Sequence, residues 1–193
     1  MGLLRQLADD WRWYARAEGR SSLSPFGFSG FWVVAVHRYG VWAYGLSTPI
    51  VGHLFRAGYR IAKILVVVIT GARIGAAATI GQRFNVHTTQ GLQIAGAVRI
   101  GDDCVVNSGV CIVHAANDRG AGAPTIGNSV YLGVGAKVIG NIKVGNNVQV
   151  GANAVVGRDI PDDMFVLSPL PVVLPRPPHR AGHPPSTGSR DQR

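Results

Sequence analysis

The chain has 193 residues, of which 47% are hydrophobic and 15% charged, and it carries a net charge of +9. This composition is too apolar for a disordered chain, and the 26 glycines do not recur at every third position as collagen requires, so we expect a folded protein of about one domain. The two cysteines, Cys104 and Cys111, exclude a disulfide scaffold and a multi-cysteine metal site, and they favour a reducing, cytoplasmic location.

The positive charge is typical of proteins that bind nucleic acid or an anionic cofactor. The basic residues concentrate in the first twenty positions and after Pro175, and no basic run alternates with aromatic residues as a stacking platform for bases would. We therefore expect no nucleic-acid binding and favour the anionic cofactor. The N-terminus shows no apolar stretch followed by a small-residue cleavage site, so no signal peptide is expected.

The first seventy residues have the periodicity of helices. Leu3, Leu7 and Trp11 recur at helical spacing, and polar and proline residues at 21–25 separate this segment from the next one. A second break at 47–49 precedes a last helix, which the pattern predicts over about residues 50–68.

The apolar stretch from Phe26 to Thr70 raises the question of a membrane. Arginine, histidine and lysine side chains interrupt it before about twenty apolar residues accumulate, so no membrane span is predicted. A peripheral membrane contact through Trp32, Trp42 and Tyr44 stays open.

From Ile74 onward the pattern changes, because an aliphatic residue, usually followed by glycine, recurs every six residues, as in IGAAAT, IGDDCV, IGNSVY and VGNNVQ. Hexapeptide repeats of this kind predict a parallel β-helix with three flat faces. The leading Ile or Val should point into the prism, and so should the slim residue four places later, which is Ala78, Cys104, Val110, Val130, Ala136, Ile142, Val148 or Ala154. Glycine and asparagine cluster at the expected corners, where a positive φ costs them little.

Two departures from the repeat mark candidate loops on a binding face. The repeat slips at residues 90–93, and it is interrupted from His114 to Thr125 by small residues, which suit a mobile loop or an arm that reaches a neighbouring subunit. After the repeat the chain is rich in proline. The expected organisation is therefore a helical region over 1–70, a β-helix domain over 71–163 and a C-terminal tail over 164–193, docked at first and then disordered.

The sequence from Leu132 to Asp163, LGVGAKVIGNIKVGNNVQVGANAVVGRDIPDD, together with the helical segment before it, resembles the hexapeptide-repeat acyltransferases and, among them, the serine O-acetyltransferases. The stretch GFSGFWVVAVHRYGVWAYG is similar to short serine-acetyltransferase-like proteins found with polysaccharide genes. The resemblance implies a mainly β fold, a left-handed parallel β-helix with an N-terminal α-helical segment. It also implies transfer of an acetyl group from acetyl-CoA to the hydroxyl of L-serine, without a metal, by a homotrimer that can pair into a dimer of trimers.

In that family a histidine acts as general base within a D-H-A-T-G motif. A gapless carry-over onto His87-Thr88-Thr89-Gln90-Gly91 places the catalytic histidine on Thr88 and the serine-binding aspartate on His87. The family's orienting aspartate falls on Arg73, and a second histidine, from a D-R-H-P loop, falls on Ala123.

Two histidines remain as candidate bases. His87 can serve if the corner shifts by one residue, and His114, at the base of the interrupting loop, can reach across a subunit boundary. Asp118 in the same loop is a candidate to orient a histidine, although a lone loop aspartate is more often a turn former. The non-catalytic alternative for His87 is a surface residue of the solenoid, and for His114 it is a residue that anchors the loop.

The resemblance also assigns a binding surface for acetyl-CoA, along the groove between neighbouring prisms. Small residues give the pantetheine arm access to backbone amides, and these are Gly133, Gly135, Ala136, Gly151 and Ala152. The candidate partners of the CoA phosphates are Lys137, Lys143 and Arg158.

The cysteines have no assigned role in this scheme. Cys104 takes a slim inward position and Cys111 a turn, and without a paired base neither is expected to act as a nucleophile. The chain ends in Asp191-Gln192-Arg193 rather than the C-terminal isoleucine with which such enzymes dock into the sulfhydrylase of cysteine synthesis, so that partner is not expected. Two alternatives to serine acetylation remain: acylation of a sugar, polysaccharide or secondary-metabolite hydroxyl or amine, and a non-catalytic scaffold.

Overall fold

The structure, a computed structural model, describes residues 3–17, 29–46, 49–117 and 120–168. Three helices come first: α1 (Leu3–Ala17), α2 (Ser29–Tyr44) and α3 (Pro49–Thr70). In the described part of the first seventy residues they confirm the predicted helices. The first predicted break, at 21–25, and the proline-rich tail lie outside the described residues. No helix in the described part of the chain combines the length and the apolar character needed to cross a membrane.

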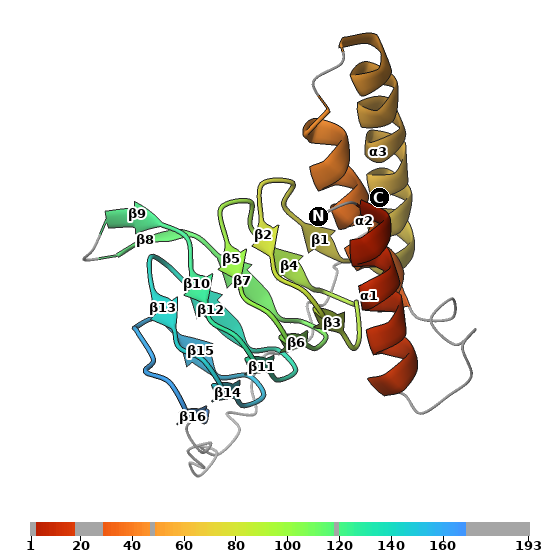
Figure 1. Ribbon diagram of the computed structural model, residues 1–193. Coiled ribbons are helices and arrows are strands. Elements are labelled where there is room, and N and C mark those ends of the chain that lie inside the picture. The colour runs from red at the N-terminus through yellow and green to blue at the C-terminus, as the bar shows by residue number, and fades with distance from the viewer. Residues whose placement is uncertain (1–2, 18–28, 47–48, 118–119, 169–193) are drawn as a thin grey trace, which may run out of the picture.

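The rest of the described chain winds into a prism with three parallel sheets as faces (Figure 1). Face A contains β1 (Arg73–Ile74), β4 (Gln93–Ile94), β7 (Cys111–Val113), β12 (Lys137–Ile139) and β15 (Val155–Val156). Face B contains β2 (Thr79–Ile80), β5 (Arg99–Ile100), β10 (Thr125–Ile126) and β13 (Lys143–Val144). Face C contains β3 (Asn85–Val86), β6 (Val105–Val106), β11 (Tyr131–Leu132), β14 (Gln149–Val150) and β16 (Phe165–Val166).

The six-residue period arises because each short strand sends one side chain inward and one outward, and a turn then leads to the next face. The leading aliphatic residues fill the prism, and all eight slim residues named above are buried with them in one continuous core. Each coil hydrogen-bonds to the next through strand backbones in register, for example Ile74 over Ile94 over Ile112. The predicted parallel β-helix is thus confirmed.

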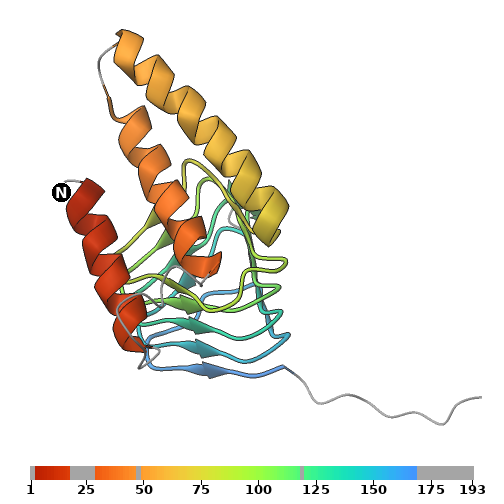
Figure 2. The ribbon, with the colours of Figure 1, turned by 90° about the vertical axis from the view of Figure 1, so that its right-hand side faces the viewer.

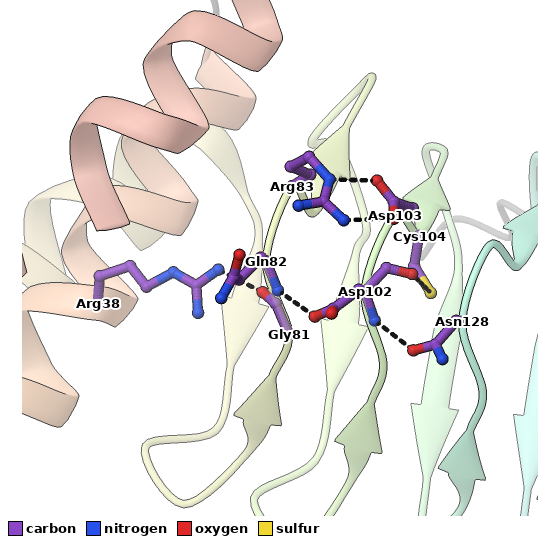
Figure 3. A network of polar contacts seen from close by, with 8 residues as sticks. All are labelled: Arg38, Gly81, Gln82, Arg83, Asp102, Asp103, Cys104 and Asn128. Carbon is purple, nitrogen blue, oxygen red and sulfur yellow. Dashed lines mark hydrogen bonds and ion pairs between the residues drawn. The ribbon is translucent and has the colours of Figure 1, made fainter. Parts of the chain in front are cut away.

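The corner between faces B and C is held by a ladder of side-chain acceptors (Figure 3). The Gln82 amide donates to Asp102 Oδ1 at 2.6 Å, and the Asp102 amide donates to Asn128 Oδ1 at 2.8 Å. The Asn128 amide continues the ladder to Asn146 Oδ1 at 2.9 Å. The next residue in each turn adopts a positive φ: Arg83, Asp103, Ser129, Asn147 and Asp163. This corner therefore uses more than glycine and asparagine, since the ladder holds the unfavourable conformation in place.

Removing one rung of this ladder should have a measurable cost. The Asn128→Ala variant loses the acceptor for the Asp102 amide, and we expect the free energy of unfolding to fall by about 1 kcal/mol in urea denaturation. The Asn128→Asp variant keeps an acceptor oxygen and should retain most of that stability. Equal losses in both variants would contradict a role for the acceptor.

The helices close the upper end of the prism, where the first coil has no coil above it (Figure 2). Successive residues of a parallel strand direct their N–H and C=O groups to opposite neighbours, so alternate residues of the first coil point both groups up, where no strand can pair with them. Arg38 on α2 donates to the carbonyl oxygen of Ile80 at 2.6 Å and to that of Gly81. From α1, the Tyr14 hydroxyl accepts the amide of Val86 at 2.8 Å.

A buried ion pair supports this cap. Arg38 Nε lies 3.1 Å from Asp10 Oδ2, and the two side chains are only 7% and 2% exposed. Burial raises the pKa of Asp10, while the guanidinium of Arg38 opposes that rise. The pair is desolvated, and the spare donors of Arg38 are satisfied by the first coil, so one arginine links α1, α2 and the prism.

His37, the neighbour of Arg38, makes folding sensitive to pH. Its imidazole hydrogen-bonds the Ala78 backbone and borders a small cavity of about 20 Å³, and its Nδ1 has no hydrogen-bond partner. Burial, together with the charges of Arg38 and Lys63, lowers the pKa of His37 from 6.5 to about 4.

The unfolded chain therefore takes up a proton on His37 near pH 6.5, and the folded chain does so only near pH 4. The stability conferred by the neutral imidazole is complete above pH 6.5 and is lost as the pH falls toward 4, by about 3 kcal/mol. The His37→Leu variant should lose less stability over the same interval, as measured by urea denaturation across this pH range. An identical pH dependence in both proteins would contradict the assignment.

Candidate functional site

His87 and Thr88 lie at the corner where face C turns into face A, on the first coil. We name this corner, formed by residues 87–92, 107–110, 133–136 and 151–154, the C–A corner. The His87 amide donates to the Val106 carbonyl oxygen at 2.9 Å, and its imidazole is exposed. The Thr88 hydroxyl accepts the amide of Ser108, from the coil below, at 2.8 Å. Thr88 thus has a structural contact, and His87 is the ionisable side chain that this corner presents to solvent.

The same corner is fastened to the helices above it. The Ser29 hydroxyl, at the start of α2, lies 3.0 Å from the hydroxyl of the buried Thr89. The α2 backbone also approaches the first coil closely, because a Cβ on Gly30 would lie 1.9 Å from the carbonyl oxygen of Val86. The turn that carries His87 is therefore packed from above and held from below.

The slip in the repeat at 90–93 is absorbed within this turn. Gly91 adopts a φ of +71°, and Gly109 and Gly135 repeat that conformation in the coils below. A Cβ on Gly91 would lie 3.4 Å from Gly109 Cα, and one on Gly109 would lie 3.4 Å from Gly135 Cα. Glycine is required here both by the positive φ and by the close stacking of the turns.

His114 lies at a different corner, where face A turns into face B on the third coil. Its side chain is exposed, and the interrupting segment that follows it forms an antiparallel hairpin of β8 (Ala115–Asn117) and β9 (Gly120–Gly122), seen projecting from the prism in Figure 1. The segment predicted as a mobile loop or an arm to a neighbouring subunit thus contains two paired strands. Asp118 falls between them and lies outside the described residues. Within one chain, His87 and His114 therefore stand at the two opposite borders of face A.

The residues assigned to acetyl-CoA divide between these two borders. The small ones, Gly133, Gly135, Ala136, Gly151 and Ala152, all lie at the C–A corner, on the coils below His87. Lys137 begins β12 beside them and donates from Nζ to the Gly135 carbonyl oxygen at 3.3 Å.

Lys143 and Arg158 lie near the other border of face A. Lys143 opens β13 on face B, and its amide donates to Asp159 Oδ1 at 2.9 Å. Arg158 follows β15 and lines a hollow of about 550 Å³ at the open lower end of the prism. Both side chains are exposed. One chain therefore does not gather all three cations around the small-residue corner.

Face A carries a polar column between the two borders. Register places Arg73, Gln93, Cys111 and Lys137 one above another, each at the outward position before a buried aliphatic residue. The expectation that Cys111 occupies a turn is wrong, because it begins strand β7 and is half-exposed on this face. The sequence pattern could have predicted this strand position, since each of these residues directly precedes the leading Ile or Val.

Cys104 keeps the inward position predicted for it. Burial raises the pKa of its thiol to about 11, and its Sγ contacts the Gly127 carbonyl oxygen at 3.2 Å. A neutral buried thiol is a poor nucleophile, so its environment suits packing alone. Within the described ranges, no three His, Cys, Asp or Glu side chains gather as a metal site would require.

Known proteins with a similar sequence or fold identify the family of this chain. The family model for the bacterial transferase hexapeptide (six repeats) matches residues 123–158. The serine acetyltransferase of Synechococcus elongatus is 34% identical over 140 residues, which cover 72% of this chain and 54% of that protein. The chain therefore spans about half the length of this relative.

Solved structures agree in fold. Serine acetyltransferase isoform 3 of Entamoeba histolytica, in complex with cysteine, superposes with a TM-score of 0.72 and 25% identity over 91% of this chain and 61% of that one. A serine acetyltransferase of Brucella abortus in complex with coenzyme A gives a TM-score of 0.72 and 24% identity over 86% of this chain and 65% of that one. The six-residue repeat, the three-faced left-handed coil and this similarity make the chain a member of the hexapeptide-repeat transferase family.

Proposed function

We propose that the protein is a cytoplasmic acetyl-CoA-dependent O-acetyltransferase whose acceptor is L-serine. The observation that carries this proposal is the similarity to serine acetyltransferases, which runs through most of this chain rather than through the repeat alone. The geometry is consistent with it, since a corner of small residues with Lys137 beside it would let a narrow thioester arm reach backbone amides.

The site that we propose forms between two copies of the chain. His87 and His114 stand at opposite borders of face A, so a side-by-side packing of prisms would bring the His87 border of one copy to the His114 border of the next. Three copies related by a threefold axis close such a ring, and the hexapeptide-repeat fold suggests a trimer. In this arrangement Lys143 and Arg158 of one copy lie toward the small-residue corner of its neighbour.

In the proposed chemistry His87 is the general base. Its imidazole accepts the proton of the serine hydroxyl as the oxygen bonds to the thioester carbonyl carbon, and the protonated ring returns a proton to the departing sulfur. Backbone amides at the C–A corner would stabilise the oxyanion of the tetrahedral intermediate. His114 of the adjacent copy would hold the acceptor.

The test is release of free thiol from acetyl-CoA by the purified full-length chain. We expect release that depends on added L-serine and that rises with enzyme concentration. Release without any acceptor would be hydrolysis, and no release would contradict serine acetylation.

A second acceptor class is favoured by one observation. A gapless carry-over of the family's motif puts Thr88 and Arg73 in place of its histidine and orienting aspartate, and on that correspondence the acceptor side departs from the family more than the donor side does. A panel of sugar and amine acceptors in the same assay separates these cases. Acetyl-CoA binding without transfer to any acceptor would instead support a non-catalytic scaffold.

A further inference from the structure

Face A and the C–A corner carry positive charge only. No aspartate or glutamate occurs in the strands of face A or among the residues of the C–A corner. The cations of face A are Arg73, at its upper end, and Lys137 further down, and both side chains are exposed. A ligand bound along this part of the chain therefore finds cations for an anionic group and no carboxylate for an ammonium group.

Arg73 lies beside the turn that carries His87. It begins β1 in the first coil, and its amide donates to the carbonyl oxygen of Leu92, the last residue of that turn, at 2.8 Å. A Cβ on Gly71 would lie 3.9 Å from the amide nitrogen of Gly91, so the segment that leads into β1 stacks on the end of the turn. The guanidinium of Arg73 and the imidazole of His87 thus border the same turn of the chain.

The guanidinium of Arg73 has no partner of its own. Within the described residues its side chain makes no ion pair and no hydrogen bond, whereas Arg38 and Arg83 are each paired with an aspartate. Lys137 lies three strands below Arg73, about 14 Å away at the usual strand spacing of about 4.8 Å. A phosphate held by Lys137 therefore does not neutralise Arg73. A site enclosed between two copies would desolvate this guanidinium, and an unpaired buried charge is costly, so the site calls for a second anion.

We propose that Arg73 binds the carboxylate of the acceptor, and that the acceptor is a hydroxy acid with or without an ammonium group. This proposal rests on the acetyl transfer proposed above and narrows the class of its acceptor. A guanidinium binds both oxygens of a carboxylate through two parallel hydrogen bonds, which would hold the acceptor with its hydroxyl toward His87. L-Serine belongs to this class, whereas neutral sugars and amines without a carboxylate fall outside it.

The first test compares three acceptors in the thiol-release assay with the full-length protein. They are L-serine, 3-hydroxypropionate, which lacks the ammonium group, and L-serinamide, which lacks the carboxylate. We expect 3-hydroxypropionate to match L-serine in kcat/KM within a few-fold. L-Serinamide should be used about 10–100-fold less well, because it loses the charge-assisted pair with Arg73. Equal use of L-serinamide and L-serine would overturn the proposal, as would failure to use 3-hydroxypropionate.

The second test changes the arginine. Arg73→Gln should raise KM for L-serine about 10–100-fold and leave KM for acetyl-CoA unchanged, and Arg73→Lys should keep part of the affinity. The matched control is Arg99→Gln, because Arg99 is also exposed and also directly precedes a leading isoleucine, but lies on face B. It should keep both KM values. Equal effects of Arg73→Gln and Arg99→Gln would overturn the proposal, as would a rise in KM for acetyl-CoA alone.

A binding measurement separates this proposal from acetyl transfer itself. Saturation-transfer NMR of 3-hydroxypropionate with the CoA-loaded protein requires no turnover. We expect binding to the unmodified protein and to Arg99→Gln, and its loss in Arg73→Gln. Binding that depends on Arg73 without thiol release from any acceptor would contradict acetyl transfer and still assign the carboxylate to Arg73. No binding to the unmodified protein, or binding that survives in Arg73→Gln, would overturn the role of Arg73.

Discussion

Replacing Arg38 by methionine should destabilise the protein by about 3–5 kcal/mol, because it leaves the carboxylate of Asp10 buried without its partner. The same change removes the donors that satisfy the carbonyl oxygens of Ile80 and Gly81 at the open end of the prism. Methionine has a similar length, so the loss reports the polar contacts more than the packing. Urea denaturation followed by circular dichroism measures it.

The matched control is Arg83→Met. Arg83 also pairs with an aspartate, Asp103, with its terminal nitrogen 2.6 Å from a carboxylate oxygen, but both side chains are 38% exposed. An exposed pair of this kind contributes about 0–1 kcal/mol. Equal losses for Arg38→Met and Arg83→Met would show that the buried pair does not cap the solenoid. The double variant Asp10→Asn/Arg38→Met should recover part of the stability, since it no longer buries an unpaired charge.

The second large effect concerns catalysis. If His87 is the general base, His87→Ala should lower kcat for serine acetylation by about 10²–10⁴-fold with little change in stability, because its imidazole is exposed. His114→Ala should act mainly on KM for the acceptor if it positions that substrate. Steady-state kinetics of thiol release, with melting temperatures measured in parallel, separates these outcomes.

Gln90→Ala is the control for His87, since its exposed side chain belongs to the same turn. It should keep near-normal kcat. Full activity in both histidine variants would remove these residues from the mechanism, and comparable losses in Gln90→Ala would attribute the effect to the shape of the turn.

The solenoid could be predicted in detail from the sequence because its repeat is local. The spacing of Ile74, Ile80 and later aliphatic residues sets which side chains enter the prism, and the structure buries them as expected. The same logic would have placed Cys111 on a strand, since it directly precedes Ile112 as Arg73 precedes Ile74.

The cap could not be predicted in this way. Arg38 appears in the sequence only as an interruption of an apolar stretch, and its contacts with Asp10 and Ile80 join residues 28 and 42 positions apart. The hairpin after His114 was also missed, because its small residues have no strand periodicity and its strands pair only with each other. The candidate site is still harder to predict from the sequence, since the two halves that we propose for it belong to different chains.

The central claim of this account is that acetyl transfer takes place between two copies of the chain, and mixed trimers test it most directly. The His87→Ala and His114→Ala chains would be co-expressed with different affinity tags, and trimers carrying both would be purified and assayed for serine-dependent thiol release. In such mixed trimers His87 of one chain faces His114 of its neighbour in about one third of the sites, so activity at serine concentrations well below KM should rise well above that of either variant alone. Activity no higher than in the separate variants would contradict a site shared between chains.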